Sequence, residues 1–166
     1  MAAQPLVEIV QFPKTRIAVL SHRGAPILLG KSIKNFIEWR QAYGPSPKVS
    51  KTFNIIYTDP AKVEAEDYRL DLAVSVSQAV EDNEFGVYSS VIPEGPCAKI
   101  RYTGTDDNLS APVQYLYQKW LQDNDVNLRS YPLFFHRVTL TGEVPPHKMV
   151  TDIYLPISYR SQERGL

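Results

Sequence analysis

The sequence predicts an α+β fold in which a strand–helix–strand–strand unit occurs twice. Three observations indicate this class: two amphipathic helical segments begin about eighty residues apart, segments rich in Val and Ile flank each of them, and the same element order follows both. A chain of 166 residues is long enough for one domain with a substantial core. We therefore expect a single domain over residues 1–157 and a polar tail over 158–166.

The first half begins with a strand and a helix. Residues 6–20 are rich in Val and Ile and are interrupted by Pro13, which is typical of a bent edge strand. Residues 27–43 change to helical periodicity, and Gly44 ends the helix. The apolar positions at this spacing are Leu29, Ile33, Phe36 and Ile37, and Trp39 is expected in the core.

Two strands complete the first half. Residues 52–59 form a strand that ends in an Asp-Pro turn, and residues 68–77 alternate strictly between apolar and polar positions. This alternation predicts a half-buried strand. One face holds Tyr68, Leu70, Leu72, Val74 and Val76, and the other holds Arg69, Asp71, Ala73 and Ser75.

The second half repeats this order. Strand material reaches Tyr102, Ser110 is the expected helix N-cap, and Pro112 lies in the first helical turn. The apolar stripe of this helix consists of Val113, Leu116, Tyr117, Trp120 and Leu121. Residues 131–140 and 148–157 supply the last two strands.

Composition excludes several classes of function. Lys plus Arg equals Asp plus Glu at 18 each, so no net positive field would attract nucleic acid. The single cysteine, Cys97, forms no internal disulfide, and no apolar run approaches the ~20 residues of a membrane helix. We expect a cytoplasmic protein that binds neither DNA nor a membrane directly.

Sequence signatures of catalysis and of cofactor binding are absent. His22, His136 and His147 stand far apart, without a second ligand at metal-binding spacing, so we expect no metal. The chain has no G-x-S-x-G, no P-loop and no G-x-G-x-x-G motif. We therefore predict no cofactor and assign no catalytic residue.

Aromatic residues are the most informative feature that remains. The chain has ten Tyr, six Phe and two Trp. Strand tyrosines can bury a ring and leave the hydroxyl for a partner, as in the walls of small-molecule pockets. Those tyrosines are Tyr57, Tyr68, Tyr102 and Tyr154.

The stretch YPLFFHRV, residues 131–138, places aromatic and charged side chains together in one strand. Alternation puts Leu133, Phe135 and Arg137 on one face and Phe134, His136 and Val138 on the other. Both faces are largely apolar, so each must be covered by protein or by a ligand. The sequence alone therefore allows two interpretations of this strand: its aromatic side chains are packed in the core, or they form the wall of a ligand pocket.

Several phrases in this order resemble those of the GyrI-like small-molecule-binding domain, from about Val7 to Ile157. YTDPAKVEAEDYRLDLAVSV resembles its Y-x-D/N-P … R-x-D … V-x-V stretch, and VIPEGPCAKIRYTG resembles its I-x-G-G-x-Y-A-V … G stretch. YPLFFHRV and TDIYLPI are similar to its closing P-x-F-E-x-Y … I-P-I/V pair. The resemblance implies a duplicated fold with a curved antiparallel sheet, two helices on one face and a ligand groove on the other.

The resemblance also implies a function and partners. Family members bind amphipathic aromatic cations, either fused to helix-turn-helix domains in multidrug-responsive activators of the AraC and MerR types or as freestanding proteins such as the gyrase inhibitory protein. We expect the freestanding form here, which senses or sequesters an amphipathic aromatic, cationic ligand. A transcription regulator or a topoisomerase is the expected protein partner. A homodimer is among the states that the resemblance allows.

This sequence departs from the family at the residue that faces the cation. The family glutamate of P-x-F-E-x-Y falls on Phe135, and its tyrosine falls on Arg137. A Phe ring offers cation–π attraction of roughly 0.5–2 kcal/mol, so affinity for flat aromatics survives while charge selectivity weakens. Arg137 would repel a cation unless Asp152 or Asp71 pairs with it.

The predicted ligand-binding residues follow from the strand tyrosines and from this departure. An acidic residue is frequent in the family at the position of Asp152, whose other role would be to pair with Arg137 or Lys148. The predicted set is Tyr57, Tyr102, Phe135, Arg137, Asp152 and Tyr154. Two further hypotheses stay open: a hydrolase of cyclopropane-type electrophiles, which some freestanding relatives are, and a protein that restrains gyrase.

Overall fold

The computed structural model describes residues 4–59 and 62–160. Within it the chain forms two compact units. Unit 2 runs from Lys14 to Pro93, and unit 1 combines the N-terminal segment up to Pro13 with the segment from Glu94 onward. No helix among the described residues combines the length and the apolar character that crossing a membrane requires.

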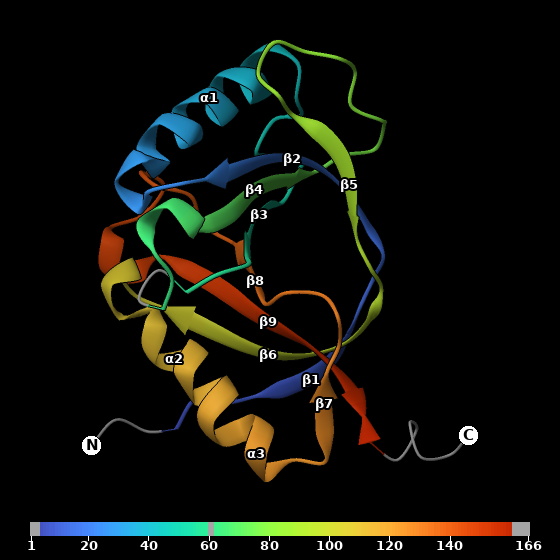
Figure 1. Cartoon of the computed structure of the whole chain (residues 1–166), viewed down its shortest axis with the longest axis vertical. Coiled ribbons are helices and arrows are strands. Elements are labelled where there is room, and N and C mark those ends of the chain that lie inside the picture. Colours follow the sequence, from blue (N-terminus) through green and yellow to red (C-terminus); the bar gives the residue numbers. More distant parts are fainter. Residues whose placement is uncertain (1–3, 60–61, 161–166) are drawn as a thin grey trace. The chain divides into compact units, whose positions relative to one another are not determined.

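Unit 2 is a four-stranded antiparallel sheet with one long helix (Figure 1). Its strands lie in the order β3-β4-β2-β5. The strands are β2 (Thr15–Arg23), β3 (Thr52–Ile56), β4 (Arg69–Ser75) and β5 (Tyr88–Ile92); the helix is α1 (Leu29–Ala42), and short 3-10 turns are η1 (Pro26–Leu28) and η2 (Ala65–Asp67).

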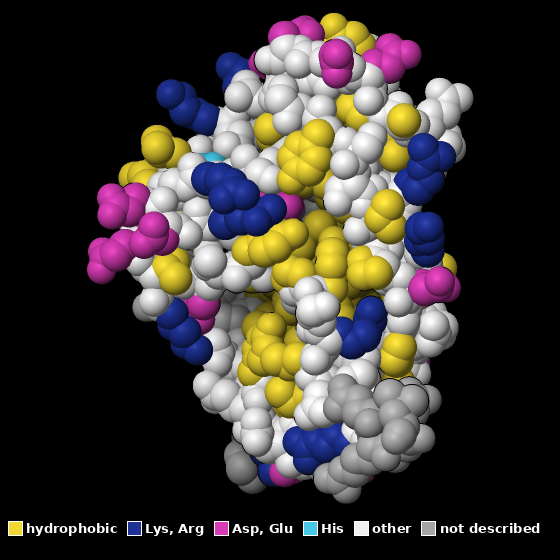
Figure 2. Space-filling view, turned by 45° about the vertical axis from the view of Figure 1, so that its right-hand side comes forward, with side chains coloured by type: hydrophobic (Ala, Val, Ile, Leu, Met, Phe, Trp, Pro, Cys, Tyr) yellow, Lys and Arg dark blue, Asp and Glu magenta, His cyan; other side chains and the backbone are white. Residues whose placement is uncertain are grey.

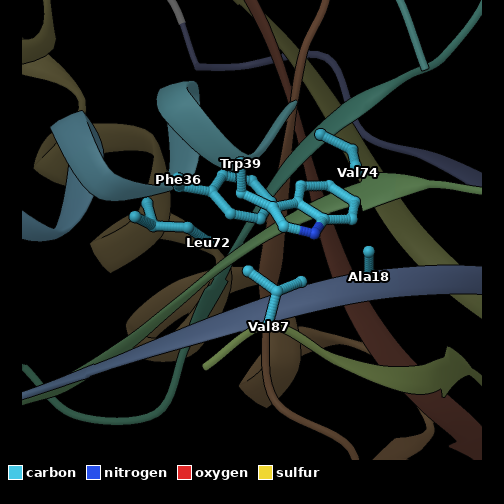
Figure 3. Close-up of a cluster of buried hydrophobic side chains, with 6 residues drawn as sticks. All are labelled: Ala18, Phe36, Trp39, Leu72, Val74 and Val87. Carbon is cyan, nitrogen blue, oxygen red and sulfur yellow. The ribbon is translucent and has the colours of Figure 1, made fainter. Parts of the chain in front are cut away.

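Helix α1 covers one face of this sheet. Its Phe36 and Trp39 rings are stacked with centroids 5.7 Å apart and pack onto the strands (Figure 3). The strand and loop residues of this cluster are Ala18, Leu72, Val74 and Val87. Leu72 and Val74 belong to the apolar face that the alternation of residues 68–77 predicted, so that face is confirmed.

Two details of unit 2 differ from the prediction. Ile33 and Ile37 are exposed, because the buried stripe of α1 centres on Phe36 and Trp39 instead. Strand β4 is also buried on both faces, and not on one, since Asp71 and Ala73 of its polar face are covered as well. The alternation of residues 68–77 correctly predicted which side chains share a face, but it did not predict that both faces are buried.

Unit 1 contains the remaining strands and the second helical segment (Figure 1). Its main strands lie in the order β1-β6-β9-β8, all antiparallel, and β7 pairs with the end of β9. The strands are β1 (Glu8–Phe12), β6 (Gly95–Thr103), β7 (Val126–Leu128), β8 (Phe134–Arg137) and β9 (Val150–Tyr159). The helical elements are η3 (Asp106–Asn108), α2 (Ser110–Tyr115), the π-helical turn η4 (Leu116–Trp120), α3 (Leu121–Asp123) and the 3-10 turn η5 (Pro146–Lys148).

The bounds of several predicted strands and helices need correction. The segment over residues 6–20 is two strands separated at Pro13: β1 is an edge strand that pairs with β6, whereas β2 lies between β4 and β5. Ser110 is the first residue of α2 and not its N-cap, because the preceding 3-10 turn leads directly into the helix. Strand β9 extends to Tyr159, two residues into the predicted tail, whose residues 161–166 lie outside the described part.

The two units share one internal register, as the predicted duplication requires. In unit 2, Ser21 of β2 pairs with Asp71 of β4, and in unit 1, Arg101 of β6 pairs with Asp152 of β9. Just beyond, a glycine N–H closes each strand pair: that of Gly24 donates to the Tyr68 carbonyl, and that of Gly104 donates to the Met149 carbonyl. Asp71 and Asp152 are therefore equivalent residues of the two halves.

Candidate functional site

The register of unit 1 separates its predicted ligand-binding residues onto two faces. Phe135 lies opposite Ile153, whereas Tyr154 and Asp152 flank Ile153 in β9. Since successive side chains of a strand point to opposite faces, Phe135 and Arg137 lie on one face and Asp152 and Tyr154 lie on the other. Tyr102 pairs with Thr151 and so shares the face of Phe135. The predicted residues of unit 1 therefore do not form one continuous wall.

On the first face, Arg137 is held by a carboxylate that the sequence prediction did not consider. Its Nη1 donates to Asp106 Oδ1 at 2.8 Å and to Thr151 Oγ1 at 3.1 Å, and its guanidinium lies 5.3 Å from the centre of the Phe135 ring. Asp106 belongs to turn η3. Arg137 therefore pairs with Asp106, and not with Asp152 or Asp71, the two acids considered from the sequence.

Tyr102 is also engaged by its own unit. Its hydroxyl donates to the carbonyl of Thr105 at 2.6 Å. A Cβ at Gly104 would lie 2.7 Å from that hydroxyl, and Gly104 has φ of +150°, so the close approach of the tyrosine requires glycine there. Tyr102 therefore stabilises the turn after β6.

On the second face, Asp152 is 2% exposed and lies among cations. Arg101 donates to both of its carboxylate oxygens, at 2.8 and 3.0 Å, and Lys99 Nζ is 3.7 Å away. Burial would raise the pKa of Asp152, but the hydrogen bonds of Arg101 and the charge of Lys99 outweigh it and hold the pKa below its usual value. Asp152 thus pairs with Arg101 and Lys99 of β6. The prediction that it pairs with Arg137 or Lys148 was wrong.

Tyr154, next to Asp152, is part of an aromatic core. It is 8% exposed, its ring stacks on Phe134 with centroids 5.2 Å apart, and Phe12 meets it edge to face at 5.0 Å. Burial and the nearby charge of Asp152 raise the pKa of Tyr154 to about 12. The ring therefore contributes packing within unit 1 and exposes little area to a ligand.

In unit 2, Tyr57 has a different environment, although it also lies near a buried aspartate. It is 38% exposed, and the Arg69 guanidinium lies 3.7 Å from the centre of its ring. The same guanidinium donates to both oxygens of Asp71, at 3.3 and 3.2 Å, and Asp71 is 2% exposed. Tyrosine, arginine and aspartate thus form a stack in which the cation lies between ring and carboxylate.

Three further residues extend this part of unit 2. Ser21 and Arg23 of β2 pair with Asp71 and Arg69 of β4 and so share their face, and Ser21 Oγ lies 2.8 Å from the exposed Tyr88 hydroxyl. We call this region the Tyr57 surface, which consists of Ser21, Arg23, Tyr57, Arg69, Asp71 and Tyr88. Figure 2 shows that hydrophobic side chains and Lys or Arg side chains are exposed together on one face of the molecule.

Sequence reasoning found only part of the Tyr57 surface. Tyr57 was predicted, and Arg69 and Asp71 were placed on one face by alternation. The other three residues, Ser21, Arg23 and Tyr88, were missed. A signal existed for Arg69, since residues at i and i+2 of a strand are neighbours on one face. Arg23 and Tyr88 become neighbours only through the pairing of β2 with β4 and β5, which the sequence does not show.

Unit 2 also contains a cavity of about 470 Å³ at the end of α1. Trp39 and Tyr43 line it together with residues 76–83. None of the predicted ligand-binding residues lies there. Cys97, the other chemically distinctive side chain, is buried in unit 1, and burial raises the pKa of its thiol, as suits a packing role.

Comparison with known proteins settles the family. The model of the GyrI-like small molecule binding domain matches residues 6–158. The chain belongs to this family. A relative described as "Probable transcriptional regulator YgiV" of Escherichia coli (strain K12) is 35% identical over 153 residues, which is 92% of this chain and 96% of the relative.

Several solved structures show the same fold. The C-terminal domain of EcmrR has a TM-score of 0.76 at 15% identity, with 95% of this chain and 99% of that domain covered. In the EcmrR–DNA complex the TM-score is again 0.76, at 14% identity, and the match covers 94% of this chain and 58% of the longer EcmrR chain. SAV2435 bound to tetraphenylphosphonium has a TM-score of 0.54 at 10% identity, with 96% of this chain and 97% of that chain covered.

Proposed function

We propose that this GyrI-like domain binds amphipathic aromatic compounds on the Tyr57 surface and thereby senses or sequesters them. The observation that carries the proposal is the family match over residues 6–158, which makes the chain a small-molecule-binding domain. The Tyr57 surface adds two exposed tyrosine rings beside charged groups, and this combination suits a ligand with one apolar and one polar side.

Each exposed tyrosine can supply ring area and a hydroxyl. Burial and the charge of Asp71 raise the pKa of Tyr57, so its hydroxyl remains protonated near neutral pH. Tyr88 lies in β5 and Tyr57 directly follows β3, and both strands belong to a sheet in which β3, β4, β2 and β5 are hydrogen-bonded side by side. A ligand would therefore meet preorganised side chains, which lowers the entropic cost of binding.

Sensing in connection with transcription is the biological role that the relatives favour. The YgiV relative is described as a probable transcriptional regulator, and EcmrR has been solved with DNA. We propose that this domain serves transcriptional regulation as the part that recognises a small molecule. This role requires that ligand binding changes the structure of the domain, and circular dichroism of the complex can detect such a change.

Binding is favoured over hydrolysis by the state of the buried carboxylates. A hydrolase needs a carboxylate or tyrosine that is free to activate water. Asp71 is held by Arg69 through both oxygens, and Asp152 is held in the same way by Arg101. Each of these carboxylates already accepts charge-assisted hydrogen bonds, so neither is poised as a general base.

Titration with a panel of aromatic dyes, read by dye fluorescence, tests the proposed function. The panel includes cationic, neutral and anionic members of similar shape, since the sequence predicts a cationic ligand and one structural neighbour was solved with tetraphenylphosphonium. We expect at least one member to bind below about 100 μM. Circular dichroism of the complex would report any accompanying change of the domain.

Single substitutions locate the site. Tyr57→Ala and Tyr88→Ala should each weaken binding about threefold to tenfold, because each ring supplies part of the contact area. Tyr43→Ala is the matched control, since Tyr43 is also exposed but lies at the end of α1, where its hydroxyl donates to Glu84. Failure of every dye to bind, or an equal loss from all three substitutions, would contradict the proposal.

A further inference from the structure

The Tyr57 surface holds its own cation, and this determines the charge of the ligand that it accepts. We propose that the surface prefers aromatic compounds with a negative group, such as a carboxylate or sulfonate, over cationic aromatics of the same shape. This inference rests on the proposed function and specifies its ligand class. It is carried by the positions of Arg69, Asp71 and Arg23 around Tyr57.

The first step concerns the position that a ligand cation would occupy. A cation-binding site combines an aromatic ring face with a carboxylate, and here those groups are Tyr57 and Asp71. The Arg69 guanidinium lies 3.7 Å from the ring centre and donates to both oxygens of Asp71. The chain therefore fills this cation site with its own side chain.

The second step concerns what displacement of Arg69 would require. Asp71 is 2% exposed, so a competing cation must enter a buried position and restore both hydrogen bonds. Burial would lower the pKa of Arg69, but the hydrogen bonds and charge of Asp71 outweigh it and raise that pKa above its usual value. Arg69 thus remains charged. Even when displaced from Asp71, its guanidinium would stay near the site and repel the incoming cation.

The third step is the net charge of the surface. Arg23 lies opposite Arg69 in the β2–β4 register, is exposed, and makes no hydrogen bond or ion pair with the other residues that the structure describes. Two arginines therefore face one carboxylate, and the surface carries one excess positive charge. A planar guanidinium donates to carboxylates in a fork geometry, so Arg23 is suited to a ligand anion.

An aromatic anion matches these groups together. Its ring would lie on the exposed parts of Tyr57 and Tyr88, and its negative group would lie beside Arg23, with Asp71 shielded by Arg69. A cationic isostere would gain the same ring contacts but would place its charge near two arginines. The difference between the two ligands is therefore electrostatic, and probes that differ only in charge can measure it.

Tetraphenylborate and tetraphenylphosphonium test the electrostatic part of this preference, because they have nearly the same shape and opposite charge and neither has a carboxylate or sulfonate group. Their affinities for the protein would be measured by isothermal titration calorimetry in sodium buffer. The two ions differ intrinsically in their affinity for apolar surfaces, so the deciding quantity is the change of their affinity ratio upon substitution. We expect the wild-type protein to bind the borate about tenfold or more tightly than the phosphonium.

Arg23→Gln is the main variant, since Arg23 is exposed and its loss should leave the fold intact. It should reduce the borate-to-phosphonium ratio about threefold to fivefold. Lys31→Gln is the matched control, because it removes one positive charge from α1, which packs on the opposite face of the sheet, and should leave the ratio unchanged. Arg69→Gln should lower the ratio further and improve phosphonium binding, because it uncovers Asp71.

The outcomes separate this inference from the proposed function. Tighter binding of the phosphonium by the wild-type protein, or a ratio that Arg23→Gln and Lys31→Gln change equally, would overturn the charge preference while the domain remains a binder of aromatics. Binding of neither ion, together with failure of the dye panel, would overturn the proposed function and this inference with it. Loss of fold in Arg69→Gln would leave the Arg23→Gln comparison decisive.

Discussion

Asp71 and Asp152 occupy equivalent positions in the two halves, yet their neighbourhoods differ. In unit 2 the carboxylate is neutralised by Arg69 of its own strand, and that arginine lies on a tyrosine ring that remains exposed. In unit 1 the carboxylate is neutralised from the adjacent strand by Arg101, and the tyrosine beside it is buried. The two halves thus share a buried and neutralised carboxylate, but the neighbouring tyrosine is exposed in unit 2 and buried in unit 1.

The packing of the two tyrosines explains this difference. Tyr154 meets Phe134 and Phe12, both of which are buried, so its ring completes a hydrophobic core. Tyr57 has a guanidinium on its ring and solvent beside it. The first ring belongs to the core, whereas the second is partly exposed, as the proposed binding surface requires. Substitutions that separate stability from binding can therefore test the comparison.

The largest expected effect is that of Tyr154→Ala on stability. Removal of a buried ring leaves a cavity among Phe12 and Phe134 and should lower the free energy of unfolding by about 3–5 kcal/mol. Tyr57→Ala should cost about 1 kcal/mol or less, because that ring is partly exposed and loses mainly the contact with Arg69. Urea denaturation measures both. Equal losses would show that the two tyrosines do not divide the roles as described.

A smaller difference should appear between the two arginines. Arg69→Gln leaves Asp71 buried without its cation and should cost about 2 kcal/mol. Arg101→Gln should cost only about 1 kcal/mol, because the Arg101 side chain is 58% exposed and Lys99 stays 3.7 Å from Asp152.

The control for this pair is the double variant Lys99→Gln/Arg101→Gln. It removes the two basic side chains that pair with Asp152, while His136 remains opposite Asp152 in β8, and it should approach the loss that Arg69→Gln causes in unit 2. The free energies of unfolding would again come from urea denaturation. If Arg101→Gln alone lowers the free energy of unfolding as much as Arg69→Gln does, Lys99 does not stabilise the Asp152 carboxylate. Each carboxylate would then depend on a single arginine.

The sequence predicted the fold better than it predicted the site, for a physical reason. Periodicity is local, so the faces of residues 69–75 and of residues 134–137 were correctly assigned, although the strand predicted over residues 131–140 is only Phe134–Arg137. Contacts between strands depend on strand order and register, which periodicity does not contain. The partner of Asp152 was therefore missed, since Arg101 becomes its neighbour only when β6 pairs with β9.

The same limit explains why the predicted site residues did not assemble. Phe135 and Tyr154 lie on adjacent strands, but the register places their side chains on opposite faces. Burial was equally hidden, because Asp71 is polar yet covered, and its burial is tolerated only with Arg69 at i−2. A search for opposite charges two residues apart in a strand would have found the Arg69–Asp71 pair.

The alkaline titration of Tyr154 gives the smallest and most specific effect. Because the pKa of Tyr154 is about 12 in the folded protein and about 10 in an unfolded chain, the folded state holds this proton more tightly. The resulting stability is fully present below pH ~10 and is lost as the pH rises from about 10 through about 12. Ultraviolet titration of wild type and Tyr154→Phe should differ by one component near pH 12, whereas Tyr57→Phe should leave that component in place. If Tyr154→Phe removes a component near pH 10 instead, Tyr154 is not held in the core and the contrast between the two halves fails.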